Sequence, residues 1–217
     1  MDEMVTKTED NRTINLQFRV NEEEMKRIEE RQAQVEICNR SAYLSLIDNM
    51  HQIVYEVLRT SFEEVNAGFC TEISITLLED GRVKIADNGR GMPLSQNAKV
   101  NQQVLDKILS GHPISSLEYA QMGDFSQCGM QVVNSLCESL QINVYRDGYC
   151  YIQDYVRGIA QHDVTCCEME HPSGTEIILK PDSLIFGDTR FSVDKIKEWV
   201  AENNKLEEIV HIKRQSC

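Results

Sequence analysis

Apolar and polar residues alternate in short runs along most of the chain, which predicts half-buried β-strands. Ile14, Leu16, Phe18 and Val20 show this two-residue period between polar neighbours. Short β-like runs of the same kind follow at 71–78, 82–86, 141–145, 150–156, 161–168 and 175–179, with a last one at 209–212. The turn-forming residues Glu79, Asp80 and Gly81 join the 71–78 and 82–86 runs, as in a hairpin.

Other stretches of the chain have apolar residues at helical spacing, which predicts helices at 21–36, 41–67, 100–109, 129–140 and 193–202. In the second helix an apolar stripe that includes Ile53 and Val57 lies opposite Glu56, Thr60 and Glu63, which recur at helical spacing. That helix stops before Gly68, a common C-terminal residue. The stretch 110–126, rich in glycine and proline, is expected to be a long loop of functional or mobile character.

Helices set between hairpin-linked strands predict an α+β two-layer sandwich, with a mixed, mostly antiparallel sheet and helices on one face. The length of 217 residues fits one such domain. We expect residues 1–20 to form an N-terminal arm and strand, and residues 21–217 to form a single domain. A strand followed by a helix also begins a ribbon-helix-helix DNA-binding module, but the acidic start of the helix at 21–36 argues against that alternative.

Charge and composition exclude several classes of function. With 22 Lys and Arg against 35 Asp and Glu, the net charge is -13, so direct binding to nucleic acid is not expected. No run approaches the ~18 apolar residues of a membrane span, and the N-terminus lacks the pattern of a secretory signal, so a cytoplasmic protein is expected. Eight cysteines without a C-x-x-C pair are interpreted as free thiols. The adjacent Cys166 and Cys167 are interpreted as strand residues, with redox sensing as the less favoured alternative.

Several short motifs follow one another in a particular order: 51–58, 67–70, 79–81, 87–93, 132–136, 145–148, 157–158 and 173–175. Together they resemble the ATP-binding domain of the B subunit of DNA gyrase and topoisomerase IV, in the GHKL superfamily, over about residues 51 to 186. The resemblance implies the GHKL (Bergerat) fold and ATP or ADP as ligand. It would correspond to the family's N-terminal ATPase domain alone, without the transducer and DNA-cleavage modules.

The resemblance also implies roles for individual residues. Asp87 would accept a hydrogen bond from the adenine amino group beside Thr175, and Glu56 would be the general base that activates water. The other implied cofactor-binding residues lie in the glycine-rich turn, on the charged rim and at the start of a helix: Gly89, Gly91, Met92, Glu64, Arg90, Arg146 and Gly129.

The chain departs from the family where magnesium and phosphate would be held. Thr60 stands at the position of the family's magnesium-binding Asn, directly after Arg59 where an Asp is usual. A Thr hydroxyl is a poorer Mg²⁺ ligand, so a firmly held Mg²⁺ is not expected. The glycine-rich phosphate lid is reduced to residues 123–129, and Asp124 puts an anion in it. The resemblance therefore implies a degenerate member that retains the adenine half of the site.

Two functions remain open from the sequence. The first is a domain that binds adenine nucleotide with weak or lost hydrolysis. The alternative is a nucleotide-independent pseudo-ATPase that acts as an interaction or regulatory module for a topoisomerase. A homodimer, or pairing with a topoisomerase subunit through the N-terminal arm, is the expected assembly. Simpler interpretations also apply to single residues: Asp87 with Gly89 and Gly91 forms an ordinary strand-ending turn, and Arg146 pairs with a nearby acid.

Overall fold

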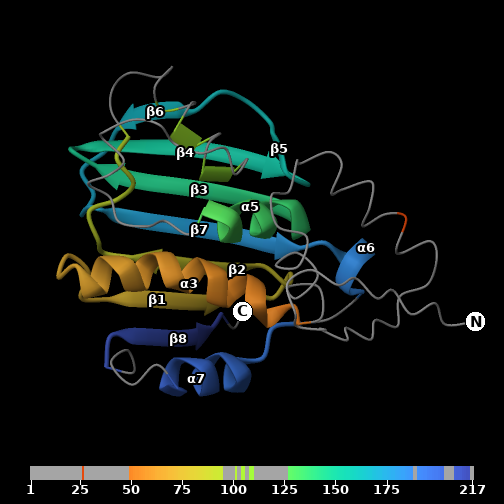
Figure 1. Cartoon of the computed structure of the whole chain (residues 1–217). Helices are drawn as coiled ribbons and strands as arrows, with labels where there is room; N and C mark the ends of the chain where they lie inside the picture. Colours follow the sequence, from red (N-terminus) through yellow and green to blue (C-terminus); the bar gives the residue numbers. More distant parts are fainter. Residues whose placement is uncertain are drawn as a thin grey trace, which may run out of the picture.

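The computed structural model describes residues 49–94, 127–187, 190–202 and 208–215, together with the single positions 26, 101, 104, 105, 108 and 109. Its centre is an eight-stranded sheet with strand order β5-β4-β3-β7-β2-β1-β8, and β6 pairs with β4 off this path (Figure 1). The strands are β1 (Ile73–Leu77), β2 (Val83–Asp87), β3 (Cys137–Arg146), β4 (Tyr149–Val156), β5 (Ile159–Ala160), β6 (Thr165–Glu168), β7 (Gly174–Pro181) and β8 (Val210–Arg214). The helices with described bounds are α3 (His51–Asn66), α5 (Gln127–Leu136), α6 (Ser183–Phe186) and α7 (Val193–Glu202).

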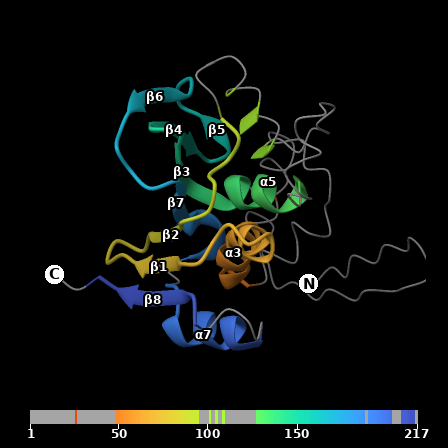
Figure 2. The same ribbon diagram turned by 90° about the vertical axis from the view of Figure 1, so that its left-hand side faces the viewer.

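The predicted α+β two-layer sandwich is confirmed. Every described strand pair is antiparallel except β1 with β8, which is parallel. Figure 2 shows α3 and α5 side by side over one face of the sheet. Among the described helices, α3 and α5 cover one face of the sheet, and none lies over the opposite, open face.

The apolar stripe of α3 forms the centre of the core. Ile53 and Leu58 are fully buried, as are Ile73 and Ile75 on β1 beneath the helix. The indole of Trp199 on α7, which lies next to β8, stacks on Tyr55 of α3 with ring centroids 4.5 Å apart. This packing fixes α3 against both the sheet and α7, so its remaining side chains have defined directions.

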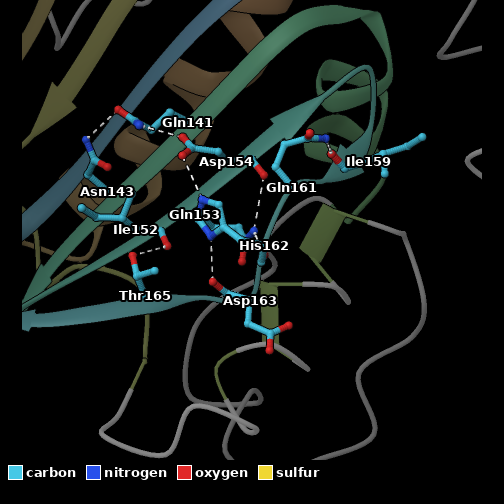
Figure 3. A network of polar contacts seen from close by, with 10 residues as sticks. All are labelled: Gln141, Asn143, Ile152, Gln153, Asp154, Ile159, Gln161, His162, Asp163 and Thr165. Atoms are coloured by element: carbon cyan, nitrogen blue, oxygen red, sulfur yellow. Dashed lines mark hydrogen bonds and ion pairs between the residues drawn. The ribbon is translucent and has the colours of Figure 1, made fainter.

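Polar side chains cover the open face of the sheet at β7, β3 and β4. Asn143 donates to Glu176 (3.0 Å), and Gln141 donates to Asp154 (2.7 Å). Asp154 in turn contacts the ring of His162 at 3.0 Å, as Figure 3 shows. The two-residue period of the strands explains this face, because each strand turns alternate residues to opposite sides.

Several predicted elements differ from the structure. The helix predicted at 41–67 begins at His51, whose backbone N–H donates to the side chain of Asn49 at 3.0 Å. The helix predicted at 129–140 ends at Leu136, whose carbonyl accepts from the backbone N–H of Asp182, and β3 begins at the next residue. The strand predicted at 161–168 begins only at Thr165, as β6, and the short β5 precedes the predicted range. The side chain of the buried Gln153 donates to the carbonyl of His162 at 2.5 Å, which removes that carbonyl from the strand ladder.

The sequence did not predict α6, which follows Asp182, whose carboxylate accepts from the N–H of Leu184 at 2.9 Å. The predicted strand at 14–20, the predicted helix at 21–36 and the predicted loop at 110–126 lie outside the described residues. In the part of the chain that the structure describes, no helix has the length and apolar character needed to cross a membrane.

Candidate functional site

Asp87, the last residue of β2, lies where α3, β2 and β7 meet. Its Oδ2 accepts from the hydroxyl of Ser61 on α3 at 2.8 Å, and its Oδ1 accepts from the N–H of Gly89 at 3.0 Å. The N–H of Thr175 on β7 also donates to Oδ1, at 3.4 Å. Burial raises the pKa of the Asp87 carboxyl above its ordinary value, while these hydrogen bonds oppose the rise. The carboxylate is therefore held in one orientation by three segments of the chain.

The turn after β2 passes close to the ends of β3 and β7 because Gly91 in the turn and Gly174 at the start of β7 have no side chain. Gly91 has φ +72°, and a Cβ there would lie 2.8 Å from the carbonyl oxygen of Tyr145. At the start of β7, a Cβ on Gly174 would collide with the carbonyl oxygen of Asp87. Met92, directly after this turn, is buried. Only glycine permits these approaches, so the turn is fixed against the ends of β3 and β7.

Glu64 and Arg90 form a bidentate ion pair beside Asp87. The guanidinium of Arg90 donates to Glu64 through Nη2 (2.7 Å) and Nε (3.1 Å), and its backbone N–H adds a third bond at 3.1 Å. Hydrogen bonding from Arg90 holds the pKa of Glu64 below its ordinary value. The same guanidinium lies over the exposed ring of Phe69, 3.8 Å from its centroid. Arg146 completes this rim by donating to the carbonyl of Gly91 at 3.4 Å.

Glu56 precedes Ser61 and Glu64 on α3, and its side chain faces Gly129 on α5. Its Oε1 is 3.0 Å from Nη1 of Arg59, and its Oε2 lies so close to Gly129 that a Cβ there would be 2.6 Å away. Burial raises the pKa of Glu56, and the charge of Arg59 opposes the rise. One turn after Glu56, the hydroxyl of Thr60 donates to the carbonyl of Val57 at 2.8 Å. The proposed magnesium ligand thus directs its hydrogen into its own helix.

The structure brings the residues selected from the sequence into two adjacent groups on α3. One surrounds Asp87 and contains the glycine turn, the backbone of Thr175 and the charged rim; the other joins Glu56 to Gly129. Most of the predicted phosphate lid, residues 123–126, lies outside the described residues. Within the ranges that the structure describes, no three His, Cys, Asp or Glu side chains form a metal-binding group.

Sequence reasoning missed two contributors to this site, Ser61 and Phe69. Ser61 is 2% exposed and lies within the apolar stripe of α3. A buried polar residue in such a stripe requires a partner, which is the signal that could have identified it. Phe69 is 50% exposed, and nothing in its local sequence indicates that a cation packs over it.

Comparisons with known proteins identify relatives of the chain. The B subunit of DNA gyrase from Thermotoga maritima is 36% identical over 157 residues, which are 70% of this chain and 25% of the relative. The B subunit of DNA topoisomerase 4 from Rickettsia bellii is 38% identical over 159 residues, 70% of this chain and 24% of the relative. The chain therefore spans about a quarter of the length of these curated relatives. No family model matches the chain.

Solved structures show the same relationship in three dimensions. The 43K ATPase domain of Thermus thermophilus gyrase B, in complex with an aminocoumarin, matches with a TM-score of 0.62 and 27% identity, covering 76% of this chain and 43% of that one. The topoisomerase IV ATP-binding domain of Francisella tularensis, in complex with a small-molecule inhibitor, matches with a TM-score of 0.60 and 26% identity, covering 75% of this chain and 80% of that one.

Proposed function

The chain belongs to the GHKL ATPase domains as a homologue of the B subunits of DNA gyrase and topoisomerase IV, and on this basis we propose that it binds an adenine nucleotide but hydrolyses it slowly or not at all. The geometry of Asp87 is the observation that supports binding most directly. A carboxylate has about four acceptor positions, and donors from Ser61, Gly89 and Thr175 take three of them. One position is left for the exocyclic amino group of adenine.

The close backbone approaches around Asp87 support the same proposal. Gly91 and Gly174 hold the turn after β2 tightly against the ends of β3 and β7, which gives the wall beside the Asp87 carboxylate a fixed shape against which a flat base could pack. Arg90 and Arg146 lie at the rim of this turn. They would supply positive charge toward the ribose and phosphates of the nucleotide.

Weak hydrolysis follows from the surroundings of Glu56. A general base must have an oxygen free to take a proton from water. Here Oε1 is paired with Arg59 and Oε2 lies against Gly129. The raised pKa of Glu56 would suit a base, but both oxygens have close neighbours and the side chain is only 13% exposed.

The residues near Glu56 do not fit a magnesium ion. Mg²⁺ requires oxygen ligands in near-octahedral geometry. Thr60 offers only one hydroxyl oxygen, and the guanidinium of Arg59, 3.0 Å from the Glu56 carboxylate, puts a cation where Mg²⁺ would have to lie and would repel it. We therefore derive no catalytic step through Mg²⁺ and propose that nucleotide binding is independent of it.

Titration calorimetry with ATP and ADP, in Mg²⁺ and in EDTA, tests the proposal. We expect measurable binding of both nucleotides with the same affinity in the two buffers, and no phosphate release from ATP. Glu56→Ala should bind as the parent does, because Glu56 is not proposed to contact adenine. Tighter binding in Mg²⁺, with turnover that Glu56→Ala abolishes, would instead identify a working ATPase.

One observation favours the alternative, a nucleotide-independent module for a topoisomerase. The Asp87 carboxylate already has three internal donors, so it is well satisfied without any ligand. An absence of heat with either nucleotide would support this alternative. Association with a topoisomerase, or homodimer formation through the N-terminal arm, would then be measured by sedimentation of the full chain with and without a purified gyrase.

A further inference from the structure

Cys150 and Cys167 face each other across the strands β4 and β6. The two residues are direct Cα partners in this antiparallel pair, and Sγ of Cys167 lies 3.8 Å from the carbonyl oxygen of Cys150. Directly opposed residues in antiparallel strands have Cα atoms about 4.5–5.5 Å apart and side chains on the same face. That spacing lies within the range of about 4.4–6.8 Å that a disulfide spans.

The two thiols differ in exposure. Cys150 is buried, whereas Cys167 is exposed on the edge strand β6. Thr165, two residues before Cys167 at the start of β6, donates to the carbonyl of Ile152 at 3.3 Å, and Figure 3 shows this adjoining part of the ladder. The pairing of the strands therefore continues beyond the cysteines and keeps them in register.

Cys166 provides an internal comparison. It is also free and exposed, but its Cα partner is Tyr151. Neighbouring residues in a strand point to opposite faces, so Cys166 and Cys167 are turned away from each other. Only Cys167 has a thiol directly opposite it in this part of the sheet.

We propose that Cys150 and Cys167 are a site of reversible oxidation, at which a small-molecule disulfide such as oxidised glutathione converts the two thiols into a cross-strand disulfide. In the first step the thiolate of Cys167 attacks one sulfur of the small disulfide, whose S–S bond breaks and releases one thiol. In the second step Cys150 loses its proton to solvent and attacks Sγ of Cys167, which releases the second thiol. Two protein thiols are oxidised, and one small disulfide is reduced to two thiols.

The burial of Cys150 determines which step is slow. Desolvation raises the pKa of its thiol to about 11, so little thiolate is present at neutral pH. The exposed Cys167 reacts first, and ring closure by Cys150 follows. Because the thiolate is the nucleophile, the rate of ring closure should rise about tenfold per pH unit between pH 7 and 10.

Peptide mapping of the full chain tests the proposal. After incubation with oxidised glutathione and alkylation of the remaining thiols, trypsin releases Cys150 in peptide 147–157 and both Cys166 and Cys167 in peptide 158–190. We expect these two peptides to be joined by a disulfide in the parent and in Cys166→Ser. In Cys167→Ser the joined species should be lost.

Removing the second thiol gives a different expected result. In Cys150→Ser, and in Cys150→Ala if the serine variant does not fold, the glutathione adduct on Cys167 should persist because no thiol can displace it. A disulfide within peptide 158–190 between Cys166 and Cys167 would overturn the proposal. So would an adduct on Cys167 that decays equally fast with and without Cys150, or a joined species that forms as fast in denaturing urea as in buffer.

Discussion

Replacing Asp87 with asparagine separates the adenine-binding role of this residue from its role in the fold. The amide oxygen can take the place of Oδ1 and keep the hydrogen bonds from the N–H groups of Gly89 and Thr175. The amide nitrogen then stands at Oδ2, opposite the hydroxyl of Ser61, which can accept as well as donate. The change therefore replaces an acceptor by a donor with little change of shape.

The expected magnitudes differ sharply between folding and binding. The unfolding free energy should change by less than about 1 kcal/mol, because every internal hydrogen bond of Asp87 can be replaced. A bond from the adenine amino group to a charged acceptor contributes about 1.5–3 kcal/mol. Its loss corresponds to binding about 10- to 150-fold weaker.

Calorimetry with ADP, together with urea unfolding, measures both quantities on the same protein. Asp80→Asn is the matched control, because it makes the same chemical change just before β2, at the end of the strand opposite Asp87, at a side chain that is 52% exposed and paired with Arg82. We expect the control to bind ADP within about twofold of the parent. If Asp87→Asn binds ADP as well as the control does, Asp87 does not accept from adenine and the assignment of the site is wrong.

Two further predictions concern the contacts that Glu64 and Glu56 of α3 make with residues outside that helix. Hydrogen bonding from Arg90 lowers the pKa of Glu64, so this carboxylate contributes stability above its ordinary pKa of 4.5 that is lost as pH falls through the lowered value. Glu64→Gln should thus be about 1 kcal/mol less stable than the parent at pH 7, and urea unfolding should show the two curves converging below pH 4.5; a constant gap would contradict the ion pair. Gly129→Ala should gain about 0.5–1 kcal/mol of helix stability only in a Glu56→Ala background, because the Glu56 carboxylate otherwise occupies the space of the new Cβ. A double-mutant cycle by urea unfolding checks this, and equal effects in both backgrounds would show that the two residues do not touch.

Local patterns predicted most of the sheet and the course of α3. Strands with one buried face carry alternation in their own residues, so β1, β2, β4 and β7 could be located without knowledge of the fold. The end of α5 could not, because Leu136 and Leu140 continue the apolar spacing although the chain changes from helix to strand between them. The break between β5 and β6 depends on Gln153, nine residues before the carbonyl that it binds. Such a contact leaves no local sequence signal.

The candidate site was predicted in its residues but not in its contacts. Glu56 and Arg59 are three residues apart on a helix, a spacing at which opposite charges meet, so their ion pair was within reach of sequence reasoning. The bond from Ser61 to Asp87 spans 26 residues and depends on how α3 lies across β2. Resemblance to a family located Asp87, but only the packing of three elements shows what holds its carboxylate.

The position of Asp87 against Gly174 has a consequence for how such a protein can change over time. A Cβ on Gly174 would meet the main chain of Asp87, while the side chain of Asp87 ties α3 and β7 to the end of β2. By contrast, Arg59 is more than half exposed, and the hydroxyl of Thr60 bonds to the carbonyl of Val57 in its own helix. Substitutions at positions 59 and 60 that abolish catalysis should therefore change the stability of the fold little, whereas a residue at 87 without an acceptor would lower it. A lineage that no longer hydrolysed ATP would therefore keep the shape of the adenine pocket, because the same residues hold α3, β2 and β7 together.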